Sequence, residues 1–298
     1  MNRAEFTAQR KIAETPSGRI AYVEQGDGPV AVFLHGILLN KYFWRRQLAE
    51  LRSMRRCIAL DLLAHGATEI APDQEVSYDA QAAMIEEFLD ALNIKQIDLV
   101  ANDTATGIAQ IFTVIHPDRV RTLTLTDGDT HDNLEPAAFK EFLTMATRGE
   151  LSKALESMLA DKKIFRSDRA MGLAYERADQ VADDTIEEYL RPFVSSPQLL
   201  HDLVRFCRKT CDNKRTRHVE SQLRMLLVPT LIVWGTDDVF FDVKWADWLA
   251  RSIPGTRRKV TITGARLYFP EERCSEFNEE LGNHWAMADK NYRPPCIG

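Results

Sequence analysis

The sequence predicts an α/β fold with a mostly parallel central sheet, helices on both faces of that sheet, and an inserted helical segment. Short apolar runs such as VAVFLHG and QIDLVAND alternate with helical stretches such as DAQAAMIEEFLDAL, which is the pattern of βαβ units around a buried parallel sheet. Between residues 133 and 218 the strand pattern stops and amphipathic stretches such as AAFKEFLTMA replace it. The strand pattern resumes at VPTLIVWGTDD.

The elements follow in order along the chain. The first 30 residues or so alternate apolar and polar residues around turn signals (TPSGRIAYVEQGDGP), which predicts an antiparallel hairpin. Parallel strands are then expected at VAVFLHG, CIALDLLAHG, QIDLVAND and VRTLTLTDGD, and later at VPTLIVWG and RKVTITG. We therefore expect one core made of residues 1–132 and 219–298, with residues 133–218 forming a helical lid over it.

Composition limits the classes of function. The chain has 298 residues, of which 45% are hydrophobic and 28% charged, an ordinary globular mixture. A net charge of −6 gives no reason to expect nucleic acid or an anionic membrane as a partner. The N-terminus lacks a signal-peptide pattern, and five scattered cysteines form neither a disulfide framework nor a zinc set. We expect a cytoplasmic protein with a small-molecule substrate and no metal or cofactor; the sequence does not indicate the oligomeric state.

The segment LVANDTATGIAQ has the pattern of a strand, a sharp turn and a helix, with Asp103 at the apex. This is the arrangement of a nucleophile elbow, usually written G-x-S-x-G, in which a reactive side chain is exposed at the end of a strand. Alanines, Ala101 and Ala105, take the place of both glycines. The alternative is that Asp103 only caps the helix, because aspartate is a favoured N-cap residue.

Four motifs in order resemble the α/β-hydrolase superfamily: FLHGILLN, DLLAHGAT, LVANDTATG and VPTLIVWGTDD. The resemblance implies an oxyanion hole built from backbone N–H groups around the HG turn and after the nucleophile. Its residues would be His35, Gly36, Ile37 and Thr104. It also implies that Asp238 is the acid that orients a catalytic histidine.

An aspartate at the nucleophile position resembles the branch that contains epoxide hydrolases and haloalkane dehalogenases. In these relatives the carboxylate attacks carbon and forms an ester, which an activated water then cleaves. The halide-binding residues of the dehalogenases have no match here, because their positions hold Thr104 and Ile37. The epoxide hypothesis remains open, and Tyr175 and Tyr189 in the lid are candidates to protonate an epoxide oxygen.

The family histidine is missing. The pattern G-A-x-H corresponds here to Gly264, Ala265, Arg266 and Leu267, and leucine cannot accept a proton. We expect His131 to replace it, since DGDTHDN follows a strand end at the sheet edge where ligands bind in such folds.

Two other histidines are weaker candidates for the base. His35 is expected to have a structural part in the HG turn, and His284 to lie at the surface of the last helix. Asp127, Asp129 and Asp132, near His131, are expected instead to bind substrate or to cap the entry to the lid.

Three functions are compatible with this pattern. The first is a hydrolase of an epoxide, ester or related small molecule, with Asp103 as nucleophile and an atypical triad. The second is a lyase, cyclase or isomerase with Asp103 as general acid or base, which would need no step that releases an ester. The third is a catalytically silent small-molecule-binding protein. The fold alone cannot choose among them.

Overall fold

The computed structural model describes residues 3–133, 139–210 and 214–291. These residues form an eight-stranded sheet with the order β1-β2-β4-β3-β5-β6-β7-β8. The strands are β1 (Lys11–Thr15), β2 (Gly18–Gln25), β3 (Val30–Leu34), β4 (Arg56–Leu60), β5 (Ile97–Asp103), β6 (Val120–Gly128), β7 (Thr230–Gly235) and β8 (Thr256–Ile262). β1 pairs antiparallel with β2, as the hairpin pattern predicts, and β2 pairs antiparallel with β4. The other neighbours are parallel, so the predicted α/β-hydrolase fold is confirmed.

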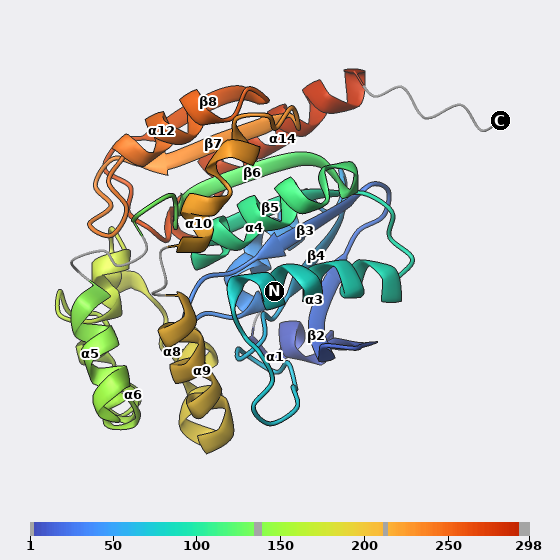
Figure 1. The fold of residues 1–298 in the computed structure, drawn as a ribbon. Helices are drawn as coiled ribbons and strands as arrows, with labels where there is room; N and C mark the ends of the chain where they lie inside the picture. The colour runs from blue at the N-terminus through green and yellow to red at the C-terminus, as the bar shows by residue number, and fades with distance from the viewer. Residues whose placement is uncertain (1–2, 134–138, 211–213, 292–298) are drawn as a thin grey trace.

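Helices cover both faces of this sheet. α3 (Tyr78–Ala91) and α4 (Thr104–Ile115) pack on each other, and α2 (Arg45–Leu51) packs on α14 (Cys274–Asn291). Figure 1 shows α3 and α4 in front of the strands. The remaining core helices are α1 (Arg3–Ala8), α12 (Lys244–Ser252) and α13 (Phe269–Glu272).

The carboxyl end of β5 lies near the middle of the sheet. β5 pairs with β3 on one side and β6 on the other, and all seven of its residues are buried. A strand buried on both faces needs a mostly apolar run, which the sequence QIDLVAND supplies apart from Asp98, paired with Arg55 and Arg121, and its polar end. That polar end, with Asp103, therefore lies where the carboxyl ends of the parallel strands meet.

Between β6 and β7 the described residues form helices and no strand. They are α5 (Lys140–Arg148), α6 (Leu151–Ala160), α7 (Lys162–Phe165), α8 (Asp183–Ser195), α9 (Pro197–Thr210), α10 (Lys214–His218) and α11 (Glu220–Leu223). α6 packs on α8, and α5 and α8 both pack on α9. Figure 1 shows α5, α6, α8 and α9 gathered beside the sheet. The division into a core and a lid of residues 133–218 stays a prediction, and residues 134–138 at its start lie outside the described residues.

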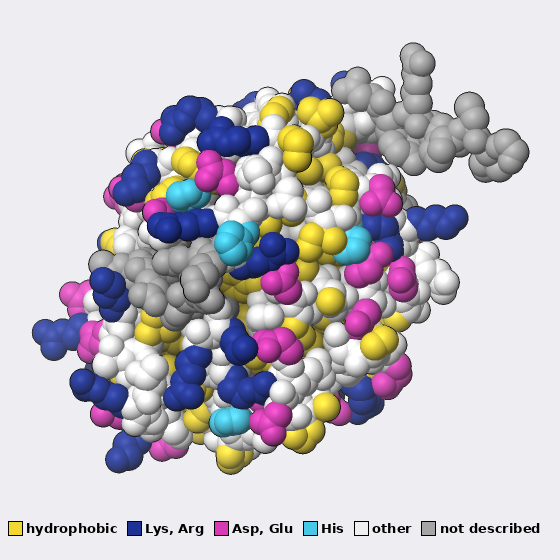
Figure 2. All heavy atoms as spheres, in the orientation of Figure 1, with side chains coloured by type: hydrophobic (Ala, Val, Ile, Leu, Met, Phe, Trp, Pro, Cys, Tyr) yellow, Lys and Arg dark blue, Asp and Glu magenta, His cyan; other side chains and the backbone are white. Residues whose placement is uncertain are grey.

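The surface carries charges of both signs. Lys and Arg side chains and Asp and Glu side chains are both spread over the face drawn in Figure 2. Within the described ranges, no helix is long and apolar enough to cross a membrane.

Candidate active site

Asp103 stands at a strained turn between β5 and α4. Its backbone has φ 61° and ψ −134°, a conformation that costs free energy for any residue other than glycine. Its side chain makes no N-cap hydrogen bond to α4. The carboxyl group is thus held in place by the turn without capping the helix, and the capping alternative loses its support.

The turn is possible because the neighbouring backbone has no side chains in the way. A Cβ on Gly36 would lie 2.1 Å from Asp103 Oδ2, and a Cβ on Gly128 would lie 2.2 Å from the Asp103 carbonyl oxygen. Ala101 and Ala105 are both fully buried, so a methyl group fits where the G-x-S-x-G pattern has glycine. The HG turn therefore lies directly against the Asp103 carboxylate.

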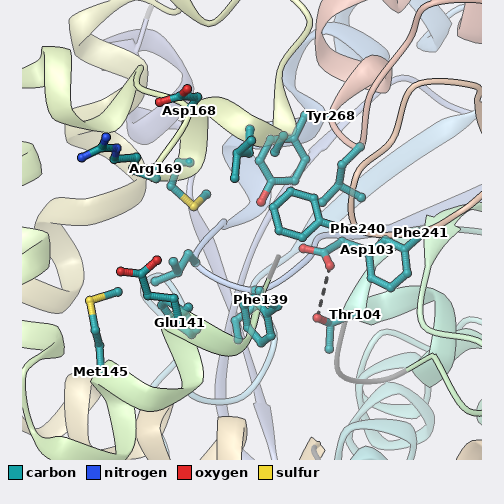
Figure 3. A pocket seen from close by; sticks show the side chains of 18 of the residues that line it. Asp103, Thr104, Phe139, Glu141, Met145, Asp168, Arg169, Phe240, Phe241 and Tyr268 are labelled. Carbon is teal, nitrogen blue, oxygen red and sulfur yellow. Dashed lines mark hydrogen bonds between the residues drawn. The ribbon is translucent and has the colours of Figure 1, made fainter. Parts of the chain in front are cut away.

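Asp103 opens on a cavity of about 310 Å³. The wall is mainly apolar and comes from the HG turn, from the helices between β6 and β7, and from the loops after β7 and β8. The apolar and aromatic lining residues are Ile37, Leu38, Phe139, Phe142, Met145, Met158, Ala170, Met171, Leu173, Ala174, Phe240, Phe241, Leu267 and Tyr268. Figure 3 shows Asp103 beside Phe240 at one end, and Glu141, Asp168 and Arg169 farther away. Such a cavity suits a small, mostly apolar molecule with a reactive group at the Asp103 end.

The Asp103 carboxyl has few partners. Backbone N–H groups of Ile37 and Thr104 lie near it and favour its charged form, and the Thr104 hydroxyl lies 3.4 Å from Oδ1. Oδ2 is buried and has no hydrogen-bond partner among the described residues. Burial and then the charge of Asp238 raise the pKa of Asp103 to about 8, against the two N–H groups, which lower it. The assignment of His35, Gly36, Ile37 and Thr104 to an oxyanion hole stays a prediction.

Asp238 lies next to a second buried carboxyl group. Asp127, near the end of β6, accepts the Gly235 N–H at 2.9 Å, and Asp238 accepts the Phe240 N–H at 2.8 Å. Burial raises the pKa of Asp238 to about 7 and that of Asp127 well above its usual range. The closeness of these two carboxyl groups favours a state in which one of them is protonated. The sequence predicts that Asp127 binds substrate or caps the entry to the lid, and it gives no sign that Asp127 and Asp238 lie together.

His131 does not face Asp103. Its Nδ1 lies 3.1 Å from Asp132 and its Nε2 lies 3.2 Å from Glu220. Its ring packs against Trp248 and Trp245 of α12. The sequence places His131 at the correct edge of the sheet, but the local turn directs its ring outside the cavity, so this geometry gives no support for His131 as the base.

The other two histidines considered as bases are also unavailable, because one is hydrogen-bonded through both ring nitrogens and the other is buried. His35 donates from Nδ1 to the Gly36 carbonyl (2.8 Å) and accepts the Leu62 N–H at Nε2 (3.1 Å). Burial lowers its pKa to about 4, so it stays neutral and braces the HG turn. His284, expected at the surface, is instead buried, because α14 packs against β6 and β7.

The hydroxyls of the two candidate lid tyrosines are hydrogen-bonded to a glutamate and do not line the cavity. The Tyr175 and Tyr189 hydroxyls donate to Glu271 at 2.9 and 3.0 Å, and Arg45 pairs with the same carboxylate. Neither tyrosine is among the cavity-lining residues. The sequence could not show this, since Glu271 lies more than 80 residues away from both.

The loop after β8 supplies two cavity residues. Leu267, at the expected histidine position, lines the cavity, and its carbonyl accepts the Asn102 side chain at 3.0 Å. Tyr268, the next residue, also lines the cavity; the G-A-x-H pattern ends at Leu267 and assigns Tyr268 no role. No histidine is among the described residues that line this cavity. The same described residues contain no cluster of His, Cys, Asp and Glu suited to a metal ion.

Comparisons with known proteins agree with this architecture. A model of the alpha/beta hydrolase fold family matches residues 29–272. The chain is 27% identical to epoxide hydrolase 4 of Mus musculus over 288 residues, covering 91% of this chain and 73% of that protein. It is 29% identical to a haloalkane dehalogenase of Mesorhizobium japonicum, over 64% of this chain and 61% of that protein. The crystal structure of a haloalkane dehalogenase from Bradyrhizobium elkani is similar in fold, with a TM-score of 0.79, 19% identity, and coverage of 95% of this chain and 99% of that one.

Proposed function

Because the chain belongs to the α/β hydrolase fold family, we propose that it is an enzyme that acts on a small, mostly apolar organic electrophile, with Asp103 as the nucleophile. An epoxide is the preferred substrate class, because the relatives include proteins named epoxide hydrolases. Esters and related small molecules are weaker candidates. The cavity of about 310 Å³ and its apolar wall support the size and the polarity of this substrate.

The observation that supports this proposal best is the unpaired Oδ2 of Asp103 inside that cavity. A buried carboxylate oxygen without a partner is costly, and such costs are found where a group must react. In the proposed step, an Asp103 oxygen forms a bond to a ring carbon of the epoxide. The carbon–oxygen bond of the ring breaks, the ring oxygen takes a proton and becomes a hydroxyl, and an ester joins Asp103 to the substrate.

The cavity offers fewer of the groups needed for the second half of the proposed reaction, the cleavage of the ester. Ester cleavage needs a group that takes a proton from the attacking water, and the described lining residues include no histidine. We therefore propose that the ester on Asp103 is long-lived and that its hydrolysis limits turnover.

One observation favours a second candidate function. A pKa of about 8 leaves most Asp103 side chains protonated at pH 7, and a carboxylic acid can donate a proton without forming an ester. A lyase, cyclase or isomerase with Asp103 as general acid is therefore the alternative. A silent binding protein is less favoured, because a binding pocket gains nothing from an unpaired buried carboxyl group.

Mass spectrometry distinguishes these functions. The protein is incubated with styrene oxide, benzyl bromide and phenyl acetate, and its intact mass and peptide masses are then measured. We expect an adduct on the peptide that contains Asp103 in the wild type, and none on that peptide in Asp103→Asn. Absence of an adduct with every reagent would remove the nucleophile role and leave the acid–base or binding roles.

A further inference from the structure

We propose that Tyr268 is the proton donor to the ring oxygen when Asp103 opens an epoxide. This inference rests on the proposed function, because it assigns an acid to the same reaction. It replaces the two lid tyrosines, whose hydroxyls are bound to Glu271 outside the cavity.

The first support is position. Tyr268 and Asp103 both line the cavity, and Figure 3 shows the Tyr268 hydroxyl directed into the cavity at the end where Asp103 lies. Among the described residues that line this cavity, Tyr268 is the sole tyrosine, and histidine, lysine and cysteine are absent. Apart from Asp103 itself, Thr104 and Asp129 also line the cavity, and Asp129 already accepts a hydrogen bond from the Tyr78 hydroxyl. The remaining lining groups that can carry a proton lie farther from Asp103: Glu141, Asp168 and Arg169.

The second support is rigidity. The Tyr268 N–H donates to the Ala174 carbonyl at 2.9 Å. Its ring makes edge contacts with Phe43 and Tyr175, with centroids 5.5 and 5.1 Å apart. The side chain is 2% exposed, so the phenol is held in one direction and loses little freedom when a substrate binds.

The third support is that the Tyr268 hydroxyl keeps its proton. Burial and then the charges of Asp103, Glu271 and Asp238 raise the pKa of Tyr268 well above its usual value. The phenol therefore stays protonated throughout the physiological range and is able to donate.

The step balances with Asp103 in its ionised form. The Asp103 oxygen forms the new carbon–oxygen bond, the ring carbon–oxygen bond breaks, and the electron pair stays on the ring oxygen. Tyr268 transfers its proton to that oxygen, which leaves the substrate as a hydroxyl-bearing ester and Tyr268 as a phenolate. A water molecule returns a proton to the phenolate before the next turnover.

Two reagents of similar size separate this role from simple packing. Styrene oxide needs a proton on its leaving oxygen, whereas benzyl bromide loses bromide without one. In Tyr268→Phe we expect the rate of Asp103 alkylation by styrene oxide to fall by at least about tenfold, given the contribution typical of general acids. The rate with benzyl bromide should change little, so the ratio of the two rates reports the acid alone.

Tyr22→Phe is the matched control, because it removes a tyrosine hydroxyl from β2, a strand that contributes no residue to the cavity wall. Its ratio of rates should equal that of the wild type. If Tyr268→Phe does not fold, the wild type is compared in H₂O and D₂O. We then expect alkylation in D₂O to slow more with styrene oxide than with benzyl bromide, whose rate reports the shift in Asp103 ionisation alone.

The outcomes separate this inference from the function on which it rests. Adducts with both reagents and an unchanged ratio in Tyr268→Phe, or an equal slowing with both reagents in D₂O, would overturn the role of Tyr268 and leave Asp103 as the nucleophile. An adduct with benzyl bromide alone would also overturn it. The absence of an adduct with either reagent would refute the role of Asp103 as nucleophile, and with it the role of Tyr268 as proton donor.

Discussion

Asp103 is surrounded by groups that disfavour its charge. It has no cationic partner among the described residues that line the cavity near it, and the nearby Asp238 adds negative charge. Two backbone N–H groups from Ile37 and Thr104 offset only part of this cost. The reactive carboxylate is therefore a minority form at neutral pH, which makes its reactivity depend strongly on pH.

We expect alkylation of Asp103 by benzyl bromide to speed up as the pH rises, with a midpoint near the pKa of about 8. The direction follows because only the ionised carboxylate attacks carbon; one pH unit below the pKa, about one molecule in ten is ionised. The measurement is the rate of adduct formation from pH 5 to pH 10.

Asp238→Asn is the companion variant for this profile. It removes the second-largest cause of the raised pKa, so the midpoint should move to lower pH. A rate independent of pH across this range, or one that falls as the pH rises, would argue against an ionised Asp103 as the reacting group.

At the scale of elements, a buried polar cluster joins the helical segment between β6 and β7 to the short helices α2 and α13. Tyr175 and Tyr189 come from the segment between β6 and β7, whereas Arg45 lies in α2 and Glu271 in α13. All three partners meet the one Glu271 carboxylate. Tyr268, two positions before the proline that precedes Glu271, lies in the same short segment. The cluster therefore fixes the loop that carries the proposed acid.

Glu271→Gln should lower the free energy of unfolding by about 3 kcal/mol, because it leaves the buried Arg45 guanidinium without a countercharge. Chemical denaturation of the variant and the wild type measures this difference. Glu69→Gln is the control: Glu69 and its partner Arg19 are both exposed, and such surface pairs contribute less than about 1 kcal/mol. Equal losses in both variants would show that the cluster has no special part in stability.

The elements were more predictable than the directions of their side chains. The apolar runs that form β3 to β7 are visible in the sequence because burial on both faces demands them. The turn at Asp103 was also predictable, since one short segment supplies its strand, apex and helix. The sequence could not predict where three side chains point. These are His131, Tyr175 and Tyr189, whose partners Glu220 and Glu271 lie about 80 to 100 residues away. Tyr268 has a weak local signal, its place beside Leu267, but only the assembled cavity gives it a role.

For the whole molecule, the fold provides more of what the first proposed step, ester formation, needs than of what the second proposed step, ester cleavage, needs. The sheet places Asp103 at its carboxyl edge, the HG turn supplies an N–H donor from Ile37, and the helices between β6 and β7 help to close an apolar cavity. The described wall of that cavity has no histidine to activate water. The central claim is that Asp103 is alkylated and that the resulting ester persists.

One measurement tests this claim directly. The wild type is first treated with styrene oxide, then moved to reagent-free buffer in heavy-oxygen water, and the mass of the Asp103 peptide is followed over time. We predict that the adduct remains for many hours and that little heavy oxygen enters the Asp103 carboxylate. Rapid loss of the adduct, with heavy oxygen appearing in Asp103, would contradict the account, because it would mean that another group activates water as efficiently as a histidine does.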